Sequence, residues 1–166
     1  MQARPASPND AASIARIYNQ GIDDRIATFE TRHRTAADIE EWFDGRHPIV
    51  VVESDGEVVA FGSTSTYRPR DCYAGVAEYS VYVAREQRGK GAGRAALVAL
   101  IEAAESAGFW KLVSRIFPDN RASTELALAV GFREVGVYEK HARLDGEWRD
   151  VVIVERLIES NLSTKP

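Results

Sequence analysis

Cysteine, methionine and histidine are scarce in this chain of 166 residues, which has one Cys, one Met and three His. The lone Cys72 cannot form an intramolecular disulfide, and a reducing cytoplasm is the compartment that suits a single thiol best. His33, His47 and His141 are too far apart in sequence for the ligand spacing of a zinc site. We therefore expect a cytoplasmic protein that binds no metal.

Long apolar runs and blocks of like charge are also missing. No segment approaches the ~18 apolar residues of a membrane-spanning helix, and Met1 to Pro5 is not an apolar signal segment. The 21 basic and 25 acidic residues, with a net charge of -4, are dispersed along the chain. We expect neither a membrane nor a nucleic acid as partner. The length favours a single domain over residues 1–166, with a flexible tail over 159–166.

Hydrophobic periodicity predicts a mixed α+β chain without internal repeats. The first expected helix starts near Ser7 and stops at Gly21, and the second is capped by Thr35 and carries Trp42 and Phe43 on its apolar face. Asp55-Gly56 is typical of a two-residue hairpin turn. The remaining helices are expected at 89–108 and 120–130, and the strands at 49–53, 58–65, 77–83, 111–117, 133–143 and 150–157.

A glycine-rich, basic segment follows the strand at 77–83 and opens a helix. The first N–H groups of a helix lack internal partners and favour an anion, so this arrangement suits a pyrophosphate. It lacks the Gly-Lys-Ser/Thr end of a Walker loop and the spacing of a dinucleotide fingerprint. A plain glycine turn with solvated cations is the alternative. The residues concerned are Arg88, Gly89, Lys90, Gly91, Ala92, Gly93 and Arg94.

This segment resembles motif A of the GNAT acetyltransferases, R/Q-x-x-G-x-G/A, through Arg88, Gly91 and Gly93 after the strand EYSVYV. The resemblance implies a central mixed, mostly antiparallel twisted sheet flanked by helices, and acetyl-coenzyme A as cosubstrate. It places the pyrophosphate on residues 88–94. It also implies that the pantetheine arm lies along the strand at Val81, Tyr82 and Val83.

Asn120 and Ser123 match a later cofactor-binding position of the family, N-x-x-S/A. Helix capping by Asn120 is the equally weighted alternative. Many GNAT enzymes carry a tyrosine in the following helix that protonates the leaving thiolate, but Ala127 stands at the matching position. Tyr138 is another candidate donor, although core packing is the commoner role of an aromatic in a strand.

Acetylation of an amine requires a group that accepts a proton from the nitrogen. Strand alternation puts Glu78 on the same face as Ser80 and Tyr82, beside the stretch assigned to the cofactor's reactive end. Glu78 is therefore the expected general base. A structural ion pair between Glu78 and an arginine is the alternative that residue chemistry alone leaves open.

The segments TFET, YRPRxxYAGVAEYSVYV and DGEWRDV resemble the phosphinothricin and methionine-sulfoximine acetyltransferase group, and most of all its arsinothricin-resistance branch. The resemblance implies a glutamate-like substrate with two anionic ends, and detoxification as the biological role. Arg68 and Arg70 offer guanidinium groups for an anion, and Tyr73 a hydroxyl. Phe29 and Glu30 are expected to wall the site.

Alternatives remain for these segments and for the activity. Arg68 and Arg70 are alternatively solvated residues of a surface loop. Phe29 and Glu30 alternatively act as a staple that holds the preceding turn. The resemblance implies a homodimer with His141 or Trp148 in its shared cleft. A protein or peptide acetyltransferase and a non-catalytic acyl-coenzyme A sensor are the rival functions.

Overall fold

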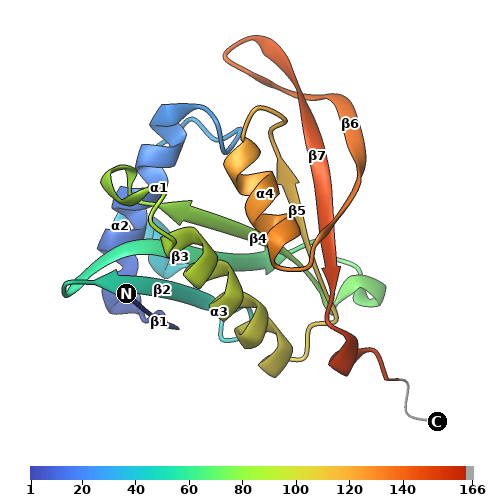
Figure 1. Cartoon of the computed structure of the whole chain (residues 1–166), viewed down its shortest axis with the longest axis horizontal. Helices are drawn as coiled ribbons and strands as arrows, with labels where there is room; N and C mark the ends of the chain where they lie inside the picture. The colour runs from blue at the N-terminus through green and yellow to red at the C-terminus, as the bar shows by residue number, and fades with distance from the viewer. Residues whose placement is uncertain (164–166) are drawn as a thin grey trace.

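The computed structural model describes residues 1–163 and shows one sheet with helices on both faces (Figure 1). The strands are β1 (Gln2–Pro5), β2 (Ile49–Ser54), β3 (Glu57–Thr66), β4 (Val76–Val83), β5 (Lys111–Ile116), β6 (Arg133–Leu144) and β7 (Glu147–Leu157). The α-helices are α1 (Ala11–Asp24), α2 (Ala36–Glu40), α3 (Ala92–Ser106) and α4 (Arg121–Ala129). Short 3-10 turns are η1 (Pro8–Asp10), η2 (Asp71–Tyr73), η3 (Arg85–Gln87) and η4 (Glu159–Asn161).

The strands are ordered β1-β2-β3-β4-β5-β7-β6 in this sheet. Each neighbouring pair runs antiparallel except β4 and β5, which run parallel. The predicted mixed, mostly antiparallel sheet is therefore confirmed. The Asp55-Gly56 turn joins β2 and β3, with φ of 52° and 80° at the two positions, as the sequence predicts.

The two faces of the sheet bury alternate residues of each strand. Val51 and Tyr82 pack with α1 and α2 in one buried cluster, whereas Val50 and Val52 pack toward α3. Ala127 joins α4 to the α3 side, in the same cluster as Leu97. Figure 1 shows this division, with α3 and α4 together on one face.

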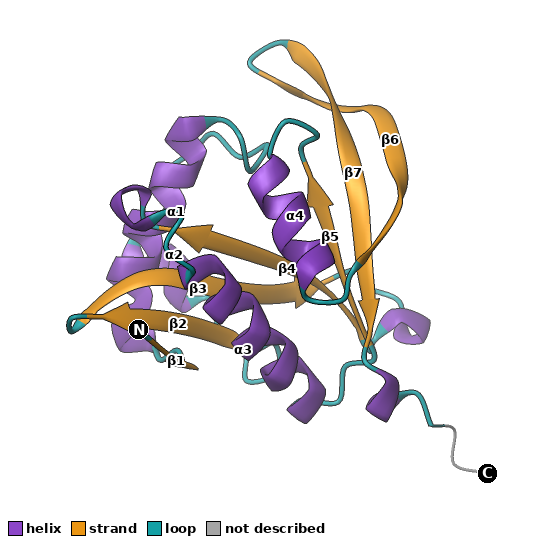
Figure 2. Cartoon of the chain, in the orientation of Figure 1, coloured by secondary structure: helices purple, strands orange, loops and turns teal. Residues whose placement is uncertain are grey.

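Strands β4 and β5 separate soon after they meet. Only three residue pairs are in register, the last being Glu78 with Val113, although both strands continue beyond it. Figure 2 shows their two arrows pointing apart from a common origin. Backbone groups beyond the branch point are therefore left without a strand partner on the inner edge.

The predicted stop at Gly21 is wrong, because α1 continues to Asp24 and ends with Arg25 in the left-handed conformation. Gly21 is buried, and a Cβ at this position would lie 2.6 Å from the ring of Tyr82. This glycine therefore permits close contact between α1 and β4, and it does not end the helix.

Three further differences concern the ends of the chain and the second helix. Helix α2 stops at Glu40, so Trp42 and Phe43 pack from the turn that follows. Strand β1 was not predicted, since four residues at an edge carry little periodicity. Of the tail predicted to be flexible, 164–166 lie outside the described residues, while the side chain of Asn161 donates to the Glu105 and Phe109 carbonyls at 2.9 and 2.8 Å.

A buried carboxylate ties the first residues to α1. The two oxygens of Asp10 each accept a hydrogen bond of 2.9 Å from Arg4, and one oxygen accepts a further bond of 2.8 Å from the Ser7 N–H. The Arg4 guanidinium and the Ser7 N–H hold the pKa of Asp10 below its ordinary value despite its burial. Asp10 therefore stabilises the fold in its charged form.

We predict that Asp10→Asn lowers the free energy of unfolding by about 2 kcal/mol near pH 7, because the variant keeps the cap but loses the charge. The folded-state pKa is depressed, so this contribution is present above the ordinary carboxyl pKa of 3.8 and is lost as pH falls below it. Urea unfolding near pH 7 and near pH 3 measures both values. The exposed carboxylate variant Asp71→Asn is the control, and an equal deficit for Asp10→Asn at both pH values would contradict the assignment.

Candidate active site

A cleft of about 790 Å³ lies where β4 and β5 separate. It is lined by residues of β3, β4 and β5 and of the segment between α1 and α2. The lining residues that matter for its chemistry are Phe29, Glu30, Arg34, Glu78, Tyr79 and Arg115. The structure thus brings Phe29 and Glu30, predicted from one segment, together with Glu78 from another.

Glu78 is held in an ion pair inside this cleft. The Nε of Arg115 donates to Glu78 Oε1 at 2.6 Å, and the carboxylate side chain is 22% exposed. Val113 and Glu78 form the last registered pair, so Arg115 comes from β5 just beyond the branch point. The ion pair that the sequence left as an alternative is therefore present, and it lies on the surface of the cleft.

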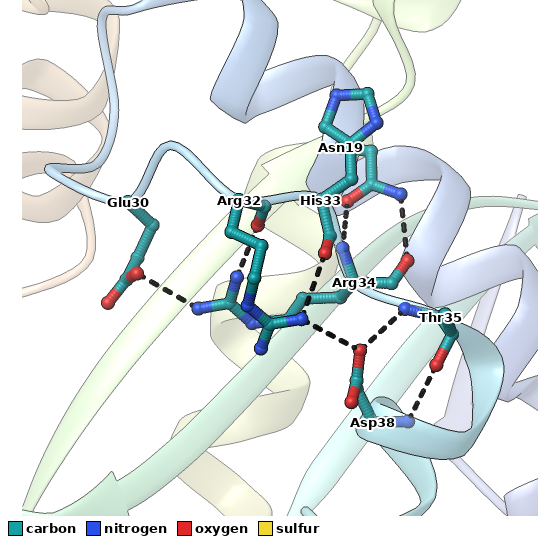
Figure 3. Close-up of polar contacts among 7 residues, drawn as sticks. All are labelled: Asn19, Glu30, Arg32, His33, Arg34, Thr35 and Asp38. Carbon is teal, nitrogen blue, oxygen red and sulfur yellow. Dashed lines mark hydrogen bonds and ion pairs between the residues drawn. The ribbon is translucent and has the colours of Figure 1, made fainter.

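A second arginine–glutamate pair faces the same cleft from the segment between α1 and α2 (Figure 3). Arg34 donates to Glu30 at 2.9 Å, with 15% of the arginine side chain exposed. Its guanidinium also lies 5.8 Å from the centre of the Tyr18 ring. Phe29 meets Phe117 edge-on, with the ring centres 4.8 Å apart.

Hydrogen bonds fix the backbone that carries this pair. The side chain of Asn19 on α1 accepts from the Arg34 N–H at 2.8 Å and donates to the Arg34 carbonyl at 2.9 Å. Thr35 and Asp38 then form a capping box at the start of α2. Figure 3 shows both clamps on one short stretch of chain. Arg34 is therefore presented to the cleft from a well-supported segment.

The glycine segment after β4 leads directly into the N-terminus of α3. Gly91 is the N-cap residue with φ of +93°, and no side chain of the described residues caps this helix end. A Cβ at Gly89 or Gly91 would meet no atom within 4 Å, so backbone conformation and not crowding requires glycine here. Ala92 is buried, whereas Lys90 and Arg94 are exposed beside the open N–H groups. The segment therefore fits a pyrophosphate.

Two arginines near this segment are tied to one carboxylate at the end of α1. Arg85 and Arg88 each lie 2.7 Å from Asp24, through different oxygens. Arg88 also donates to the Val83 carbonyl at 3.3 Å. Hydrogen bonding from Arg85 lowers the pKa of Asp24. These contacts hold the Arg85 and Arg88 guanidinium groups between the end of β4 and the N-terminus of α3.

The later cofactor position serves as a helix cap. The side chain of Asn120 accepts from the Ser123 N–H at 3.3 Å and donates to the Ile26 carbonyl at 3.3 Å. Ala127, on the same helix, is completely buried. A donor from α4 at that position is therefore absent from this chain.

The remaining predicted residues do not all reach the cleft. Arg68 and Tyr138 line a smaller cavity of about 130 Å³ that also contains Glu78 and Arg115. Tyr138 is 51% exposed, so the core-packing alternative does not hold for it. Arg70 is exposed on the preceding loop. Tyr73 and Arg70 are not among the residues that line either cavity.

Comparison with known proteins identifies the family of this fold. Residues 14–132 match the Acetyltransferase (GNAT) family. The chain belongs to the GNAT acetyltransferase family. An L-methionine sulfoximine/L-methionine sulfone acetyltransferase of Pseudomonas paraeruginosa is 34% identical over 92% of this chain and 91% of its own length.

Two solved structures show the same GNAT fold. A phosphinothricin acetyltransferase from Sinorhizobium meliloti in complex with acetyl-coenzyme A has a TM-score of 0.90 at 29% identity, covering 99% of this chain and 92% of that one. A ribosomal-protein-alanine N-acetyltransferase from Brucella melitensis has a TM-score of 0.90 at 29% identity, covering 95% and 100%.

The GNAT chain is accordingly an N-acetyltransferase that uses acetyl-coenzyme A. None of the helices within residues 1–163 is both long and apolar enough to cross a membrane. The same residues contain no group of three or more His, Cys, Asp and Glu side chains arranged to hold a metal ion.

Sequence reasoning missed two arginines of this GNAT site. Arg115 lies in a strand, and its partner Glu78 is 37 residues away, so only the parallel pairing of β4 and β5 brings them together. Arg34 lies in a segment with several charged residues, and nothing in its spacing distinguishes it from its neighbours. The signal that was available is the predicted role of Glu30, which lies four residues before Arg34 in the same loop and pairs with it.

We predict that Gly91→Ala raises the KM for acetyl-coenzyme A about 10-fold, because an L-residue at positive φ costs roughly 1–2 kcal/mol and its Cβ obstructs the approach of a phosphate. Steady-state kinetics with acetyl-coenzyme A measures this change. Gly56→Ala is the matched control, since Gly56 has φ of +80° and equally open surroundings in the distant β2–β3 turn. A KM that rises equally in both variants would show that the effect is general destabilisation.

Proposed function

We propose that this GNAT enzyme, acting as a single domain in the cytoplasm, acetylates the α-amino group of a small glutamate-like amino acid. Methionine sulfoximine, phosphinothricin and arsinothricin are the candidate substrates, and their detoxification is the proposed role. The observation that supports this most strongly is the presence of two arginine–glutamate pairs, Arg34–Glu30 and Arg115–Glu78, on one cleft. Such a cleft offers both cations and anions to a zwitterionic ligand.

Glu78 is the proposed general base. An α-amine is largely protonated near neutral pH, so a proton must leave the nitrogen before or during its attack on the thioester carbonyl. After that first proton has left, the C–N bond forms, the C–S bond breaks to release the coenzyme A thiolate, and the second proton of the nitrogen passes through Glu78 to solvent. Arg115 positions the carboxylate through its 2.6 Å contact at the branch point of β4 and β5.

The charged ends of the substrate are assigned to the remaining groups of the cleft. Arg34 suits an anionic end because its guanidinium is largely buried and its planar fork binds carboxylates and phosphinates bidentately. Glu30 suits the ammonium group, and Phe29 forms an apolar wall. Arg68 approaches Glu78 from the smaller cavity and is a second candidate for the anion.

Acetyl-coenzyme A is proposed to bind on the α3 side of β4. The pyrophosphate would be held by the open N–H groups and cations of residues 88–94, and the pantetheine by the free inner edge of Val81 to Val83. A Cβ at Gly93 would lie 3.4 Å from the Val83 side chain, so the start of α3 lies against β4. Asn120 and Ser123, at the start of α4, are the last residues assigned to the cofactor, and the Asn120 side chain caps the helix by accepting from the Ser123 N–H.

Protein acetylation is the rival activity. It is included in the tests because the fold is similar to that of the Brucella melitensis ribosomal-protein-alanine N-acetyltransferase. A peptide chain requires an extended groove, whereas the charged groups here converge on one cleft beside Glu78. A non-catalytic sensor has no need for a carboxylate at the branch point. Both rivals therefore receive less support than a small amino acid.

We predict that Glu78→Gln lowers kcat by about 10²–10⁴-fold, the usual contribution of a positioned general base. Coenzyme A release is measured with methionine sulfoximine, phosphinothricin, arsinothricin, glutamate, methionine and a lysine peptide. The exposed variant Glu57→Gln, in the β2–β3 hairpin, is the control. Turnover of the peptide alone would overturn the substrate assignment, and acetyl-coenzyme A binding without turnover would favour the sensor.

A homodimer is also proposed, through the outer strand of the sheet. Strand β6 is at the edge and nearly all of its residues are exposed. Val135, Val137 and Tyr138 are 47–51% exposed along it, and Trp148 on β7 is 54% exposed. An edge strand with exposed apolar side chains favours pairing with another chain. His141, 4.9 Å from the Tyr138 ring, would then lie near the interface.

We predict that Val137→Glu shifts the protein to a monomer in light scattering coupled to size exclusion, because it places a charge within the apolar edge. Val98→Glu is the matched control, since Val98 is also exposed but lies on α3. A monomeric wild-type protein at the same concentration would contradict the dimer.

A further inference from the structure

One buried hydroxyl of this chain has no hydrogen-bond partner. Three buried side-chain atoms of the described residues lack one: Asp24 Oδ2, Arg149 Nε and Tyr79 Oη. Asp24 Oδ2 lies 2.7 Å from Arg88, and the Arg149 guanidinium lies 5.2 Å from the centre of the Phe117 ring. Tyr79 Oη is not part of an ion pair, and its residue is only 4% exposed. Proteins rarely leave a buried polar group unsatisfied without a reason.

Tyr79 is the first residue of β4 beyond the registered pairs with β5, so it lies at the branch point. Its backbone carbonyl is fixed there by the Ser114 hydroxyl, which donates to it at 3.0 Å from β5. Its ring packs against Phe132, with the ring centres 5.0 Å apart. Main chain and ring are therefore both held. The Ser114 side chain acts on the Tyr79 hydroxyl and lowers the pKa of Tyr79 against the larger effect of burial, but its hydrogen bond goes to the Tyr79 carbonyl and none is formed with the hydroxyl.

Glu78 and Tyr79 lie on opposite faces of β4. Tyr79 belongs to the buried cluster with Leu97 of α3 and Ala127 of α4, whereas Tyr82, on the Glu78 face, packs with α1. Residues 88–94 lead into α3, which packs on the Tyr79 face, so a coenzyme A held by them would enter from that face. The amine, held in the cleft by the Glu30 and Arg34 side chains, enters from the Glu78 face.

We infer that the Tyr79 hydroxyl donates a hydrogen bond to the thioester sulfur and stabilises the thiolate as it leaves. This inference rests on the proposed function, since it places the amine and the thioester at the same branch point. It supplies a donor in a chain whose α4 has the completely buried Ala127 where a hydroxyl was sought. The amine then attacks from the Glu78 face of β4, and the thiolate leaves toward the Tyr79 face.

The chemical step balances without transfer of the tyrosine proton. The ammonium nitrogen first loses one proton to water through Glu78. The free amine then forms a bond to the carbonyl carbon, and the second proton that the nitrogen loses passes to Glu78 and then to water. The C–S bond breaks, and the sulfur leaves as a thiolate that accepts the Tyr79 hydrogen bond and takes a proton from solvent on release. Burial raises the pKa of Tyr79, so the hydroxyl keeps its proton and remains a donor throughout.

Tyr79→Phe removes the hydroxyl and keeps the ring, which makes it the decisive variant. A hydrogen bond to a developing charge is worth enough to predict a loss in kcat of about 10- to 100-fold. The KM for acetyl-coenzyme A should change by less than about 2-fold. The melting temperature should stay the same or rise, because the variant removes an unsatisfied polar group from the interior.

Phe132→Leu is the matched control, because it loosens the packing around the Tyr79 ring but leaves the hydroxyl in place. It should lower the melting temperature and leave kcat within about 3-fold. Wild-type kcat in Tyr79→Phe, or parallel losses of kcat and melting temperature in both variants, would overturn the inference.

A second reaction separates this inference from the proposed substrate. Release of coenzyme A from acetyl-coenzyme A and water requires no amine, but the same thiolate leaves. Tyr79→Phe should slow this hydrolysis by a similar factor, whichever amine the wild-type enzyme accepts. If the wild type acetylates none of the amino acids and Tyr79→Phe still slows hydrolysis, the substrate assignment fails alone. Unchanged hydrolysis in Tyr79→Phe overturns the role of the hydroxyl.

Discussion

The site depends on the early separation of two parallel strands. Because β4 and β5 remain paired for only three residue pairs, the sheet is open at its centre, and backbone groups on both strand edges there have no strand partner. The Ser114–Tyr79 hydrogen bond holds the two strands at the vertex. Helix α3 begins just after the far end of β4, so the segment proposed to bind the pyrophosphate and the slot proposed to hold the pantetheine both adjoin this strand.

Charge is arranged on this frame in pairs. Glu78 with Arg115 and Glu30 with Arg34 place opposite charges beside each other, which limits the cost of keeping them in a partly enclosed cleft. Under the proposed function, a zwitterionic substrate replaces one partner of a pair with its own group of the same charge. Asp24 plays a comparable part outside the cleft, where it orients Arg85 and Arg88 near the start of α3.

Local sequence signals predicted most of this fold. Gly91 with its positive φ, the Asp55-Gly56 turn and the capping residue Thr35 each act within a few positions, so the chain itself displays them. The site was predicted only in part. Glu78, Phe29 and Glu30 share the cleft as expected, whereas Arg115 required the pairing of distant strands, and Arg70 lies away from it. Gly21 misled because its contact with Tyr82 is tertiary.

The most direct test of the account is a crystal structure with coenzyme A. The account predicts a pyrophosphate at the N-terminus of α3 and a pantetheine arm in the slot between β4 and β5, with the thiol beside the Tyr79 hydroxyl and Glu78 on the opposite face of the strand. Coenzyme A bound elsewhere, or a slot filled by side chains while the ligand is present, would contradict it.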